Sequence, residues 1–277
     1  MTQPRVMKIS QSEVSTYLAC EKKHQFAFLN KLEPKQQSEG ITKGNAGHAF
    51  FEQFLKSGGD FDSAVVKAIE SDPYSASTLV PRLKHWEEHV FPKLGWKRYV
   101  LIEETVNLDV AYLADINVQL VFPFTADVLI ENTKNEMVLV DHKFLADPYS
   151  DETVAVAKQL PLYIGAMRAS GYPVKYAMYN IVRTRANATE WCLQKKVTPD
   201  DLQITTQFND QVVMMERIAR AKIKAEEAGK AEAIRTSDPL ICKWCPFAVP
   251  CKQGMSGTGK VDPLTIKMNF QRNSYGY

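Results

Sequence analysis

The spacing of apolar positions divides the chain into a helical part, a strand-rich part and a second helical part. In the first part apolar residues recur every three to four positions, which is typical of amphipathic helices. The predicted helices cover about residues 10–30, 44–55 and two segments of 61–90 separated near Pro73, with a polar loop at 31–43. Ser10, with Glu13 three positions later, has the capping-box pattern that begins a helix.

Alternating and β-branched residues replace the helical spacing from Arg98 onward, and they predict five strands. The strands cover 98–110, 119–131, 137–144, 174–184 and 188–196, with a helix at about 152–170 between the third and the fourth. A long polar helix is predicted at about 198–230. Helices on both sides of a strand-rich centre predict an α/β fold with a central mixed β-sheet flanked by helices.

Charge and hydropathy narrow the classes of protein that fit. The formal net charge of +2 gives no overall basic field, so a nucleic-acid partner would have to be held by local groups. No apolar run approaches the length that spans a bilayer, and the first residues lack the layout of a signal peptide. We therefore expect no membrane partner and a cytoplasmic location, in the host cell if the protein is phage-encoded.

Two charged residues, Asp141 and Lys143, interrupt the apolar run that begins at Val138. The preceding link has hairpin length, and a turn centred on Lys134 would place Asp127 directly opposite Asp141. Strand alternation puts Lys143 on the same face as Asp141. Two carboxylates and a lysine can hold a divalent metal and act on a phosphodiester. A solvated, ion-paired hairpin end fits these residues equally well.

Four short motifs resemble those of the PD-(D/E)XK nuclease superfamily and its RecB-like branch. In chain order they are Gly44-Asn-Ala-Gly-His48, Asp127 in Phe-Thr-Ala-Asp-Val-Leu-Ile, Asp141-His-Lys143 and Gln159-Leu-Pro-Leu-Tyr163. Their order, and their placement on helix, strand, strand and helix, agree with that family. The resemblance implies a restriction-endonuclease-like core and a metal-dependent deoxyribonuclease.

The resemblance also implies a role for each motif residue. His48, Asp127, Asp141 and the backbone carbonyl of His142 would bind Mg²⁺ or Mn²⁺. Asp127, Asp141 and Lys143 would be catalytic. Gln159 and Tyr163 would position the substrate and the lysine. Taken without the other motifs, His48 is better explained as a packed or solvated helix histidine. Glu52, one helical turn beyond His48, is expected to support the site.

Two positions depart from the family pattern. Phe144 follows the lysine where many relatives carry a small hydroxyl side chain. Pro161 lies inside the last motif, and a proline in a helix interior removes a hydrogen bond and clashes with the preceding turn. We therefore expect the helix either to begin close to Gln159 or to be kinked.

Three of the five cysteines, Cys242, Cys245 and Cys251, are spaced C-x2-C-x5-C, which favours metal ligation over disulfides in a reducing compartment. A closed site needs a fourth ligand, and Cys20 and Cys192 are the candidates. A lone strand cysteine such as Cys192 is usually an apolar filler. The arrangement resembles the iron-sulfur staple of AddB-type nucleases and of CRISPR-associated exonucleases, which implies a 4Fe-4S cluster on Cys20 and the three later cysteines. Zinc is the alternative, because softness and ligand count fit both metals.

The family resemblance extends from Cys20 to Cys251, which favours a single nuclease domain over two small ones. We expect this domain at 1–253, with a helical part at 1–95, the core sheet and its helix at 96–197, and the last helix with the cysteines at 198–253. Residues 254–277, rich in Gly, Ser and Asn, are expected to form a flexible tail or a partner-binding arm.

The function predicted from these features is a metal-dependent DNA exonuclease that acts on single-stranded ends. The resemblance to the CRISPR-associated branch favours 5′-to-3′ polarity and a role in recombination, repair or phage- or CRISPR-type DNA processing. The sequence has no Gly-rich phosphate loop, so resection of duplex ends would need a helicase or recombination partner. Candidates for contacts with nucleic acid are Arg183, Arg185, Tyr17, Trp86 and Trp244.

Two hypotheses from other classes remain open at this point. One is a non-catalytic DNA-binding or scaffold protein with a structural iron-sulfur or zinc site. The other is a redox protein centred on the cysteines, which would leave Asp141 and Lys143 unexplained.

Overall fold

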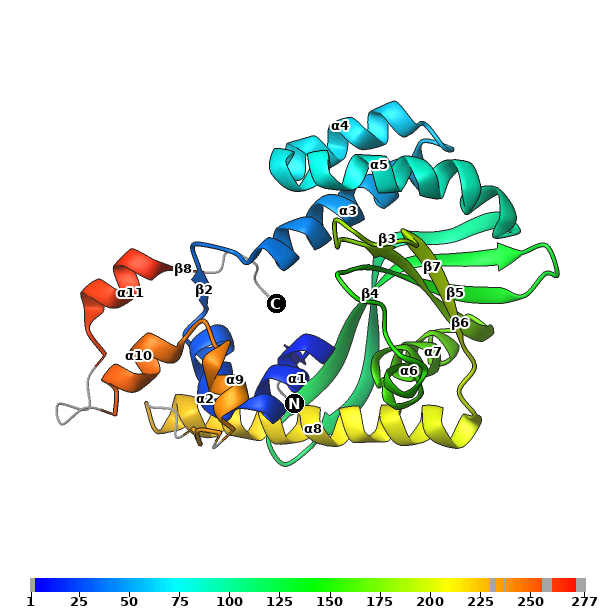
Figure 1. The fold of residues 1–277 in the computed structure, drawn as a ribbon. Helices are drawn as coiled ribbons and strands as arrows, with labels where there is room; N and C mark the ends of the chain where they lie inside the picture. The colour runs from blue at the N-terminus through cyan, green and yellow to red at the C-terminus, as the bar shows by residue number, and fades with distance from the viewer. Residues whose placement is uncertain (1–2, 230–232, 237, 256–260, 273–277) are drawn as a thin grey trace. The chain divides into compact units, whose positions relative to one another are not determined.

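The computed structural model describes residues 3–229, 233–236, 238–255 and 261–272. It divides into two compact units (Figure 1). Unit 1 comprises Met1–Gln37, Asp109–Pro123 and Asp210–Tyr277, and unit 2 comprises Ser38–Leu108 and Phe124–Asn209. None of the described helices is long and apolar enough to cross a membrane.

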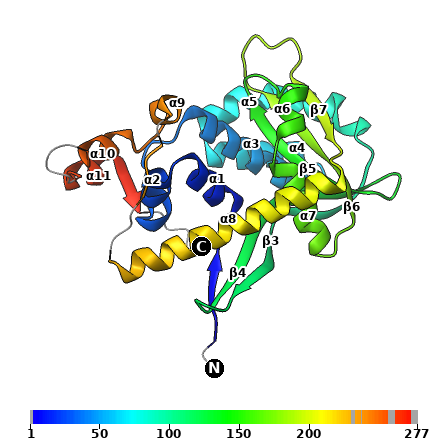
Figure 2. The same ribbon diagram turned by 90° about the horizontal axis from the view of Figure 1, so that it is seen from below.

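The central sheet has six strands in a mixed arrangement. They are β1 (Arg5–Lys8), β3 (Trp96–Leu113), β4 (Val118–Asn132), β5 (Met137–Leu145), β6 (Val174–Arg183) and β7 (Cys192–Val197). The order is β1-β4-β5-β6-β7, and β3 also pairs with β4. Figure 2 shows β1 beside the hairpin of β3 and β4. The β1–β4 and β5–β6 pairs are parallel, whereas β4–β5 and β6–β7 are antiparallel. The predicted α/β class with a central mixed sheet flanked by helices is confirmed.

In unit 2 three helices lie on one face of the sheet (Figure 1), and the first and third of them contact its strands. They are α3 (Glu39–Lys56), α4 (Phe61–Ser71) and α5 (Pro73–His89), and a single turn of 3₁₀-helix, η2 (Phe91–Lys93), follows. Asp60 and Asp72 cap α4 and α5 by accepting hydrogen bonds from backbone N–H groups. The core consists of aromatic side chains from these helices, such as Phe51 and Trp86, against strand residues such as Val140. Figure 1 shows α6 (Asp151–Val156) and α7 (Gln159–Ala169) on the other side of the strands.

Unit 1 contains the remaining helices and a small second sheet. Its elements are α1 (Gln11–Ala19), α2 (Glu21–His24), the π-helix η1 (Gln25–Leu29), β2 (Leu32–Pro34), α9 (Pro239–Lys243), α10 (Ala248–Gln253), α11 (Pro263–Asn269) and β8 (Phe270–Arg272). Helix α8 (Asp201–Glu227) begins in unit 2 and continues into unit 1. Strands β2 and β8 pair antiparallel. The rings of Phe26 and Phe270 each stack on Phe247, with centroids 5.4 and 5.2 Å apart.

Element boundaries differ from the prediction at three places. The first predicted helix is interrupted at Cys20, whose backbone is extended (φ −169°, ψ 114°). Helix α3 begins at Glu39, inside the predicted loop, and the helix expected at 152–170 is divided into α6 and α7 at Ala157. The capping interaction of Ser10 is confirmed, because its hydroxyl accepts from the Glu13 N–H at 3.3 Å.

The segment 254–277, predicted to be a flexible tail, contains α11 and β8. Residues 256–260 and 273–277 of that segment lie outside the described residues.

Close packing between α3 and β5 explains the unusual phenylalanine after Lys143. A Cβ atom built on Gly47 would lie 2.0 Å from the Phe144 ring, far inside any van der Waals contact. Gly47 therefore gives Phe144 its space, and Phe144 in turn packs edge-on to the ring of His48 with centroids 5.7 Å apart. No heavy atom comes within 4 Å of a Cβ built on Gly44, so the first glycine of the motif is not required for packing among the described residues.

Gly47→Ala should therefore destabilise the protein, whereas Gly44→Ala should not. The added methyl group overpacks the α3–β5 contact, which we expect to cost about 1–3 kcal/mol. The same change at Gly44 in the same helix should be neutral or stabilise by up to about 1 kcal/mol. Denaturant unfolding measures both. The double variant Gly47→Ala/Phe144→Ala should lose less stability than the sum of the two single variants. If the two losses simply add, the contact between Gly47 and Phe144 is not the cause of the destabilisation.

Candidate active site

The β4–β5 ladder brings the two predicted aspartates together. The ladder ends at the pair of Val128 with Val140, and Asp127 and Asp141 each lie one residue beyond it, which agrees with the predicted register. The backbone N–H of His142 donates to Asp127 Oδ2 at 2.7 Å. A carboxylate on one strand is thereby bound to the backbone of the other, which fixes the strands at this point.

Strand alternation separates the site into two faces, also as predicted. Lys143 Nζ lies 2.5 Å from Asp141 Oδ2, so these two side chains share one face. The ring of His142 stacks on Phe51 of α3, with centroids 3.8 Å apart and the rings nearly parallel. The His142 side chain is therefore part of the core, and only its backbone is available to the site.

Helix α3 contributes His48, which forms a compact group with two acids. His48 Nδ1 lies 3.1 Å from Glu103 Oε1 and 3.6 Å from Asp127 Oδ2. One donor atom from each of the three residues lies within 4.8 Å of the others. One nitrogen and carboxylate oxygens are donors that suit a divalent cation such as Mg²⁺ or Mn²⁺. The group could therefore hold a metal ion.

Glu103 is the residue that the sequence did not predict. It lies in β3 with φ +49°, the left-handed region that strand residues other than glycine rarely adopt. Such backbone strain clusters at functional sites. Its neighbour Glu104 is exposed, and no sequence feature distinguishes the two glutamates. The predicted support from Glu52 is wrong, because Glu52 pairs with Lys56 at 2.6 Å and His48 is bound by Glu103 instead.

Burial and repulsion leave the two aspartates short of compensating charge. Burial raises the pKa of Asp127 above its ordinary value, and the attraction of His48 offsets this only in part. Burial and the charge of Asp127 raise the pKa of Asp141 to about 6, despite Lys143. The ion-pair partner of Asp141 Oδ2 is Lys143 Nζ, at 2.5 Å. The negative charge of the two aspartates is therefore only partly offset by their neighbours. A bound cation would supply the missing positive charge, as expected for metal ligands.

Neighbouring carboxylates favour the charged forms of the two bases of the site. Burial alone would lower the pKa of His48, but its bond to Glu103 and the charge of Asp127 raise it on balance. Burial likewise opposes the charge of Lys143, and Asp141 outweighs burial, so the pKa of Lys143 is raised. A metal ion at His48 would therefore compete with a proton.

The last motif lies at the start of α7. The helix begins at Gln159, so Pro161 falls in the first turn, where its missing N–H has no helical partner to lose. The first of the two expectations for this proline is confirmed. Burial raises the pKa of Tyr163, while its hydrogen bond with Gln159 opposes this and the charge of Asp141 adds to it. Tyr163 therefore lies within electrostatic reach of the acid pair.

A buried hydrogen-bond network fixes the tautomer of His142. Asn180 Oδ1 accepts from Trp86 Nε1 at 3.0 Å and from Gln194 Nε2 at 3.2 Å. The amide nitrogen of Asn180 must then donate to His142 Nδ1, which lies 2.9 Å away. Burial lowers the pKa of His142 well below its ordinary value, so the ring is neutral with its proton on Nε2.

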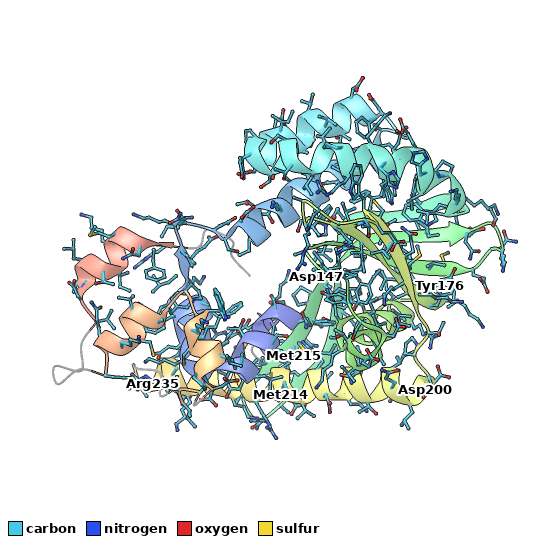
Figure 3. The ribbon with its side chains drawn as sticks, in the orientation of Figure 1. Asp147, Tyr176, Asp200, Met214, Met215 and Arg235 are labelled. Atoms are coloured by element: carbon cyan, nitrogen blue, oxygen red, sulfur yellow. The ribbon has the colours of Figure 1, made fainter. Side chains whose placement is uncertain are left out.

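The groups suggested for nucleic-acid contact are only partly available. Trp86 is 0% exposed, so its prediction as a stacking platform is wrong. Asp147, labelled in Figure 3, pairs with both Arg183 and Arg185. Trp244 is 79% exposed, and Tyr17 is half-buried with its ring against His24.

The four cysteines of the predicted cluster all lie in unit 1, and none is in a disulfide: Cys20, Cys242, Cys245 and Cys251. Thr236 N–H donates to Cys20 Sγ at 3.4 Å, and the Nε–H of Arg235, labelled in Figure 3, donates to Cys251 Sγ at 3.3 Å. Burial raises the pKa of Cys245, and the neighbouring Cys20 and Cys251 add to it. Among the described residues no three of these sulfurs lie within 4.8 Å of one another.

Comparison with known proteins identifies the family. Residues 8–252 match the model of the PD-(D/E)XK nuclease superfamily, so the chain belongs to this superfamily. A solved structure from Eubacterium rectale, named "Putative exonuclease", is 11% identical with a TM-score of 0.53, and the match covers 82% of this chain and 84% of that one. SSO0001 is 13% identical with a TM-score of 0.36, over 86% of this chain and 96% of that one. No curated protein matches the sequence.

Asp141→Asn should remove a pH-dependent loss of stability from the metal-free protein. The pKa of Asp141 is about 6 in the folded state, and that of an unfolded aspartate is about 3.9. Between these values the folded state binds more protons, so wild-type stability falls as the pH rises. Relative to the variant, the free energy of unfolding should fall on the order of 2 kcal/mol between about pH 4 and about pH 7. Denaturant unfolding in EDTA measures this, and parallel pH profiles would contradict the assignment.

Proposed function

We propose that this protein is a metal-dependent deoxyribonuclease that removes nucleotides from the ends of single-stranded DNA. The observation that carries the proposal is the Asp141–Lys143 ion pair beside the group of His48, Glu103 and Asp127. Membership of a nuclease superfamily supports phosphodiester hydrolysis.

The residues that would hold Mg²⁺ or Mn²⁺ are His48, Glu103, Asp127, Asp141 and the backbone carbonyl of His142. A bound divalent ion would lower the pKa of water and polarise the phosphodiester. The ammonium group of Lys143 is fixed by Asp141 and is suited to stabilise the charge that develops on the phosphoryl oxygens.

Three further groups prepare the site for its substrate. The Gln159–Tyr163 pair, at the start of α7, positions the substrate and Lys143. Asp127 is oriented by the His142 N–H, so its carboxylate need not reorganise when metal and DNA bind. Preorganisation of this kind is the main contribution that a protein makes to phosphoryl transfer.

The finer features of the function rest on resemblance. The motif order supports the RecB-like branch, and the neighbour named "Putative exonuclease" supports attack at strand ends. We take 5′-to-3′ polarity and a place in recombination, repair or phage- or CRISPR-type DNA processing from the same branch. A helicase or recombination partner would open duplex ends. We also propose that residues 1–253 act as one nuclease domain, because the family match runs across both units.

A 4Fe-4S cluster on Cys20, Cys242, Cys245 and Cys251 is proposed as the second cofactor. N–H donors to the sulfurs of Cys20 and Cys251 suit thiolate ligands. Around one zinc ion the sulfurs would lie about 3.8 Å apart, from Zn–S bonds of about 2.3 Å. A cubane binds each thiolate to a different iron, so its ligands are spaced more widely than those of one zinc ion.

Iron content per chain after anaerobic purification tests the cluster. Cys245→Ala should lose the iron, whereas Cys192→Ala should keep it, because Cys192 is buried in the apolar core of unit 2. Iron retained by Cys245→Ala, or stoichiometric zinc in the wild type, would refute this cofactor.

Lys143→Met should strongly slow strand degradation and leave metal binding in place. A labelled single strand incubated with Mn²⁺ should be shortened by the wild type and not in EDTA. The variant should be slower by roughly 10²–10⁴-fold, the range of a positioned catalytic group. Lys134→Met, an exposed lysine in the β4–β5 turn, is the matched control and should keep full activity.

Equal rates for Lys143→Met and wild type, or degradation that persists in EDTA, would refute the nuclease mechanism. Tight binding of the strand without any cleavage by the wild type would instead identify a non-catalytic DNA-binding protein.

A further inference from the structure

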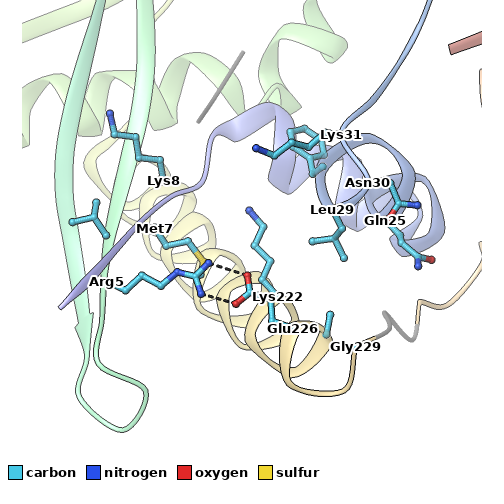
Figure 4. Close-up of a pocket in the computed structure, with 13 residues that line it drawn as sticks. Arg5, Met7, Lys8, Gln25, Leu29, Asn30, Lys31, Lys222, Glu226 and Gly229 are labelled. Atoms are coloured by element: carbon cyan, nitrogen blue, oxygen red, sulfur yellow. Dashed lines mark hydrogen bonds and ion pairs between the residues drawn. The ribbon is translucent and has the colours of Figure 1, made fainter. Parts of the chain in front are cut away.

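A pocket of about 910 Å³ lies in unit 1 and does not include any residue of the candidate active site (Figure 4). Its walls come from β1, the π-helix η1 with the two residues after it, and the second half of α8. The lining residues include Arg5, Lys8, Phe28, Leu29, Lys31 and Lys222. The volume is far larger than a single phosphate group needs, and it lies at the upper end of the range of about 300–1,000 Å³ for ligand sites.

Two of the pocket's cations are fixed by acidic partners. Arg5 makes a two-pronged ion pair with Glu226, at 2.6 and 2.8 Å, which Figure 4 shows as dashed lines. Lys222 Nζ lies 2.7 Å from Oε1 of Glu13, a carboxylate that is only 3% exposed and also binds His24. These cations are held in place, and their charge is largely balanced within the fold.

The other two cations, Lys8 and Lys31, are exposed and uncompensated. Neither ammonium group makes an ion pair or a hydrogen bond within the part of the chain that the structure describes. Figure 4 shows them on different segments, Lys8 on β1 and Lys31 beyond the helix that carries Leu29. The pocket therefore presents two free positive charges at separate points.

The backbone beside Lys31 is unusual in two ways. The five residues Gln25–Leu29 form a π-helix, a conformation that is rare and frequent at functional sites. Lys31 follows with φ +51°, a left-handed conformation that costs a residue with a side chain about 1 kcal/mol or more. Gln25 and Leu29 of the π-helix line the same pocket. The chain thus adopts a costly path where it presents a lysine to the pocket.

Apolar and amide side chains also line the pocket. Phe28 and Leu29 offer half-buried apolar surface, and Asn30 offers an amide group. Cations on separate segments, together with apolar surface in the same pocket, suit the phosphates and bases of a single strand better than one compact anion, which would need convergent cations.

We propose that this pocket binds the phosphodiester backbone of single-stranded DNA, with Lys8 and Lys31 as the phosphate contacts. The ion-paired Arg5 and Lys222 shape the wall, and the apolar side chains accept the bases. This inference deepens the proposed function, because it assigns the strand a binding site that does not depend on the catalytic metal.

The test is the affinity of a fluorescent oligothymidine strand, measured by anisotropy in EDTA so that no cleavage occurs. Lys8→Gln/Lys31→Gln should bind about tenfold or more weakly, and its salt dependence should be reduced by a slope of about 1.4, from about 0.7 for each lost phosphate contact. Lys8→Arg/Lys31→Arg should bind like the wild type. A matched control, Lys134→Gln/Lys175→Gln, removes two exposed lysines of unit 2 and should change affinity less than twofold.

Competitors identify the chemistry of the ligand. An unlabelled DNA strand should displace the probe, whereas a strand with an uncharged methylphosphonate backbone should not. Displacement by tripolyphosphate at the same phosphate concentration would show a site for free polyphosphate and would overturn the assignment to DNA.

Unchanged affinity of Lys8→Gln/Lys31→Gln, or no binding by the wild type, would also overturn the proposal. These results can be told apart from a failure of the proposed nuclease function. If the pocket does not bind DNA, metal-dependent cleavage should still be observed. If the protein does not cleave DNA, the binding measured in EDTA should still be observed.

Discussion

Two buried carboxylates on neighbouring strands, Asp127 and Asp141, impose the constraint that explains the rest of the site. Burial raises the pKa of both, and each is further affected by its neighbours, Glu103 at Asp127 and Asp127 at Asp141. Burying like charges is costly unless cations compensate them. His48 and Lys143 offset part of this negative charge. The part that they leave would attract a divalent metal ion.

The scaffold holds this repulsive arrangement through contacts on the opposite face of the sheet. Phe144 packs into the space left by Gly47 on α3, and this contact is made possible only by the missing side chain. The neutral ring of His142 is fixed between Phe51 and Asn180, while its backbone N–H holds Asp127. Residues 142–144 of β5 thus combine three roles. Phe144 packs in the core, the His142 ring is held in one tautomer, and the His142 N–H orients the predicted metal ligand Asp127.

Much of this was predictable from the sequence, because it depends on local spacing. Strand alternation and the length of one turn were enough to set Asp127 opposite Asp141 and to put Lys143 beside it.

The short strands β1, β2 and β8 were not predicted. A strand of three or four residues carries too little pattern, and it forms only through distant partners. Trp86 was wrongly assigned to the surface, because its burial depends on how α5 packs and not on its local sequence. Glu103 was missed because its role comes from a left-handed backbone angle and a tertiary contact with His48. Which cations of the pocket in unit 1 are paired depends on long-range contacts such as that of Arg5 with Glu226, and it could not be read from composition.

The most direct measurement of the central claim is a calorimetric titration of the iron-replete protein with Mn²⁺. Glu103→Gln removes a carboxylate from the group with His48 and Asp127, and Glu104→Gln removes the neighbouring exposed one. Glu103→Gln should weaken Mn²⁺ binding by about 10–100-fold, and Glu104→Gln should bind as the wild type does. Equal Mn²⁺ affinity for wild type and Glu103→Gln would show that the ion is not held by this group.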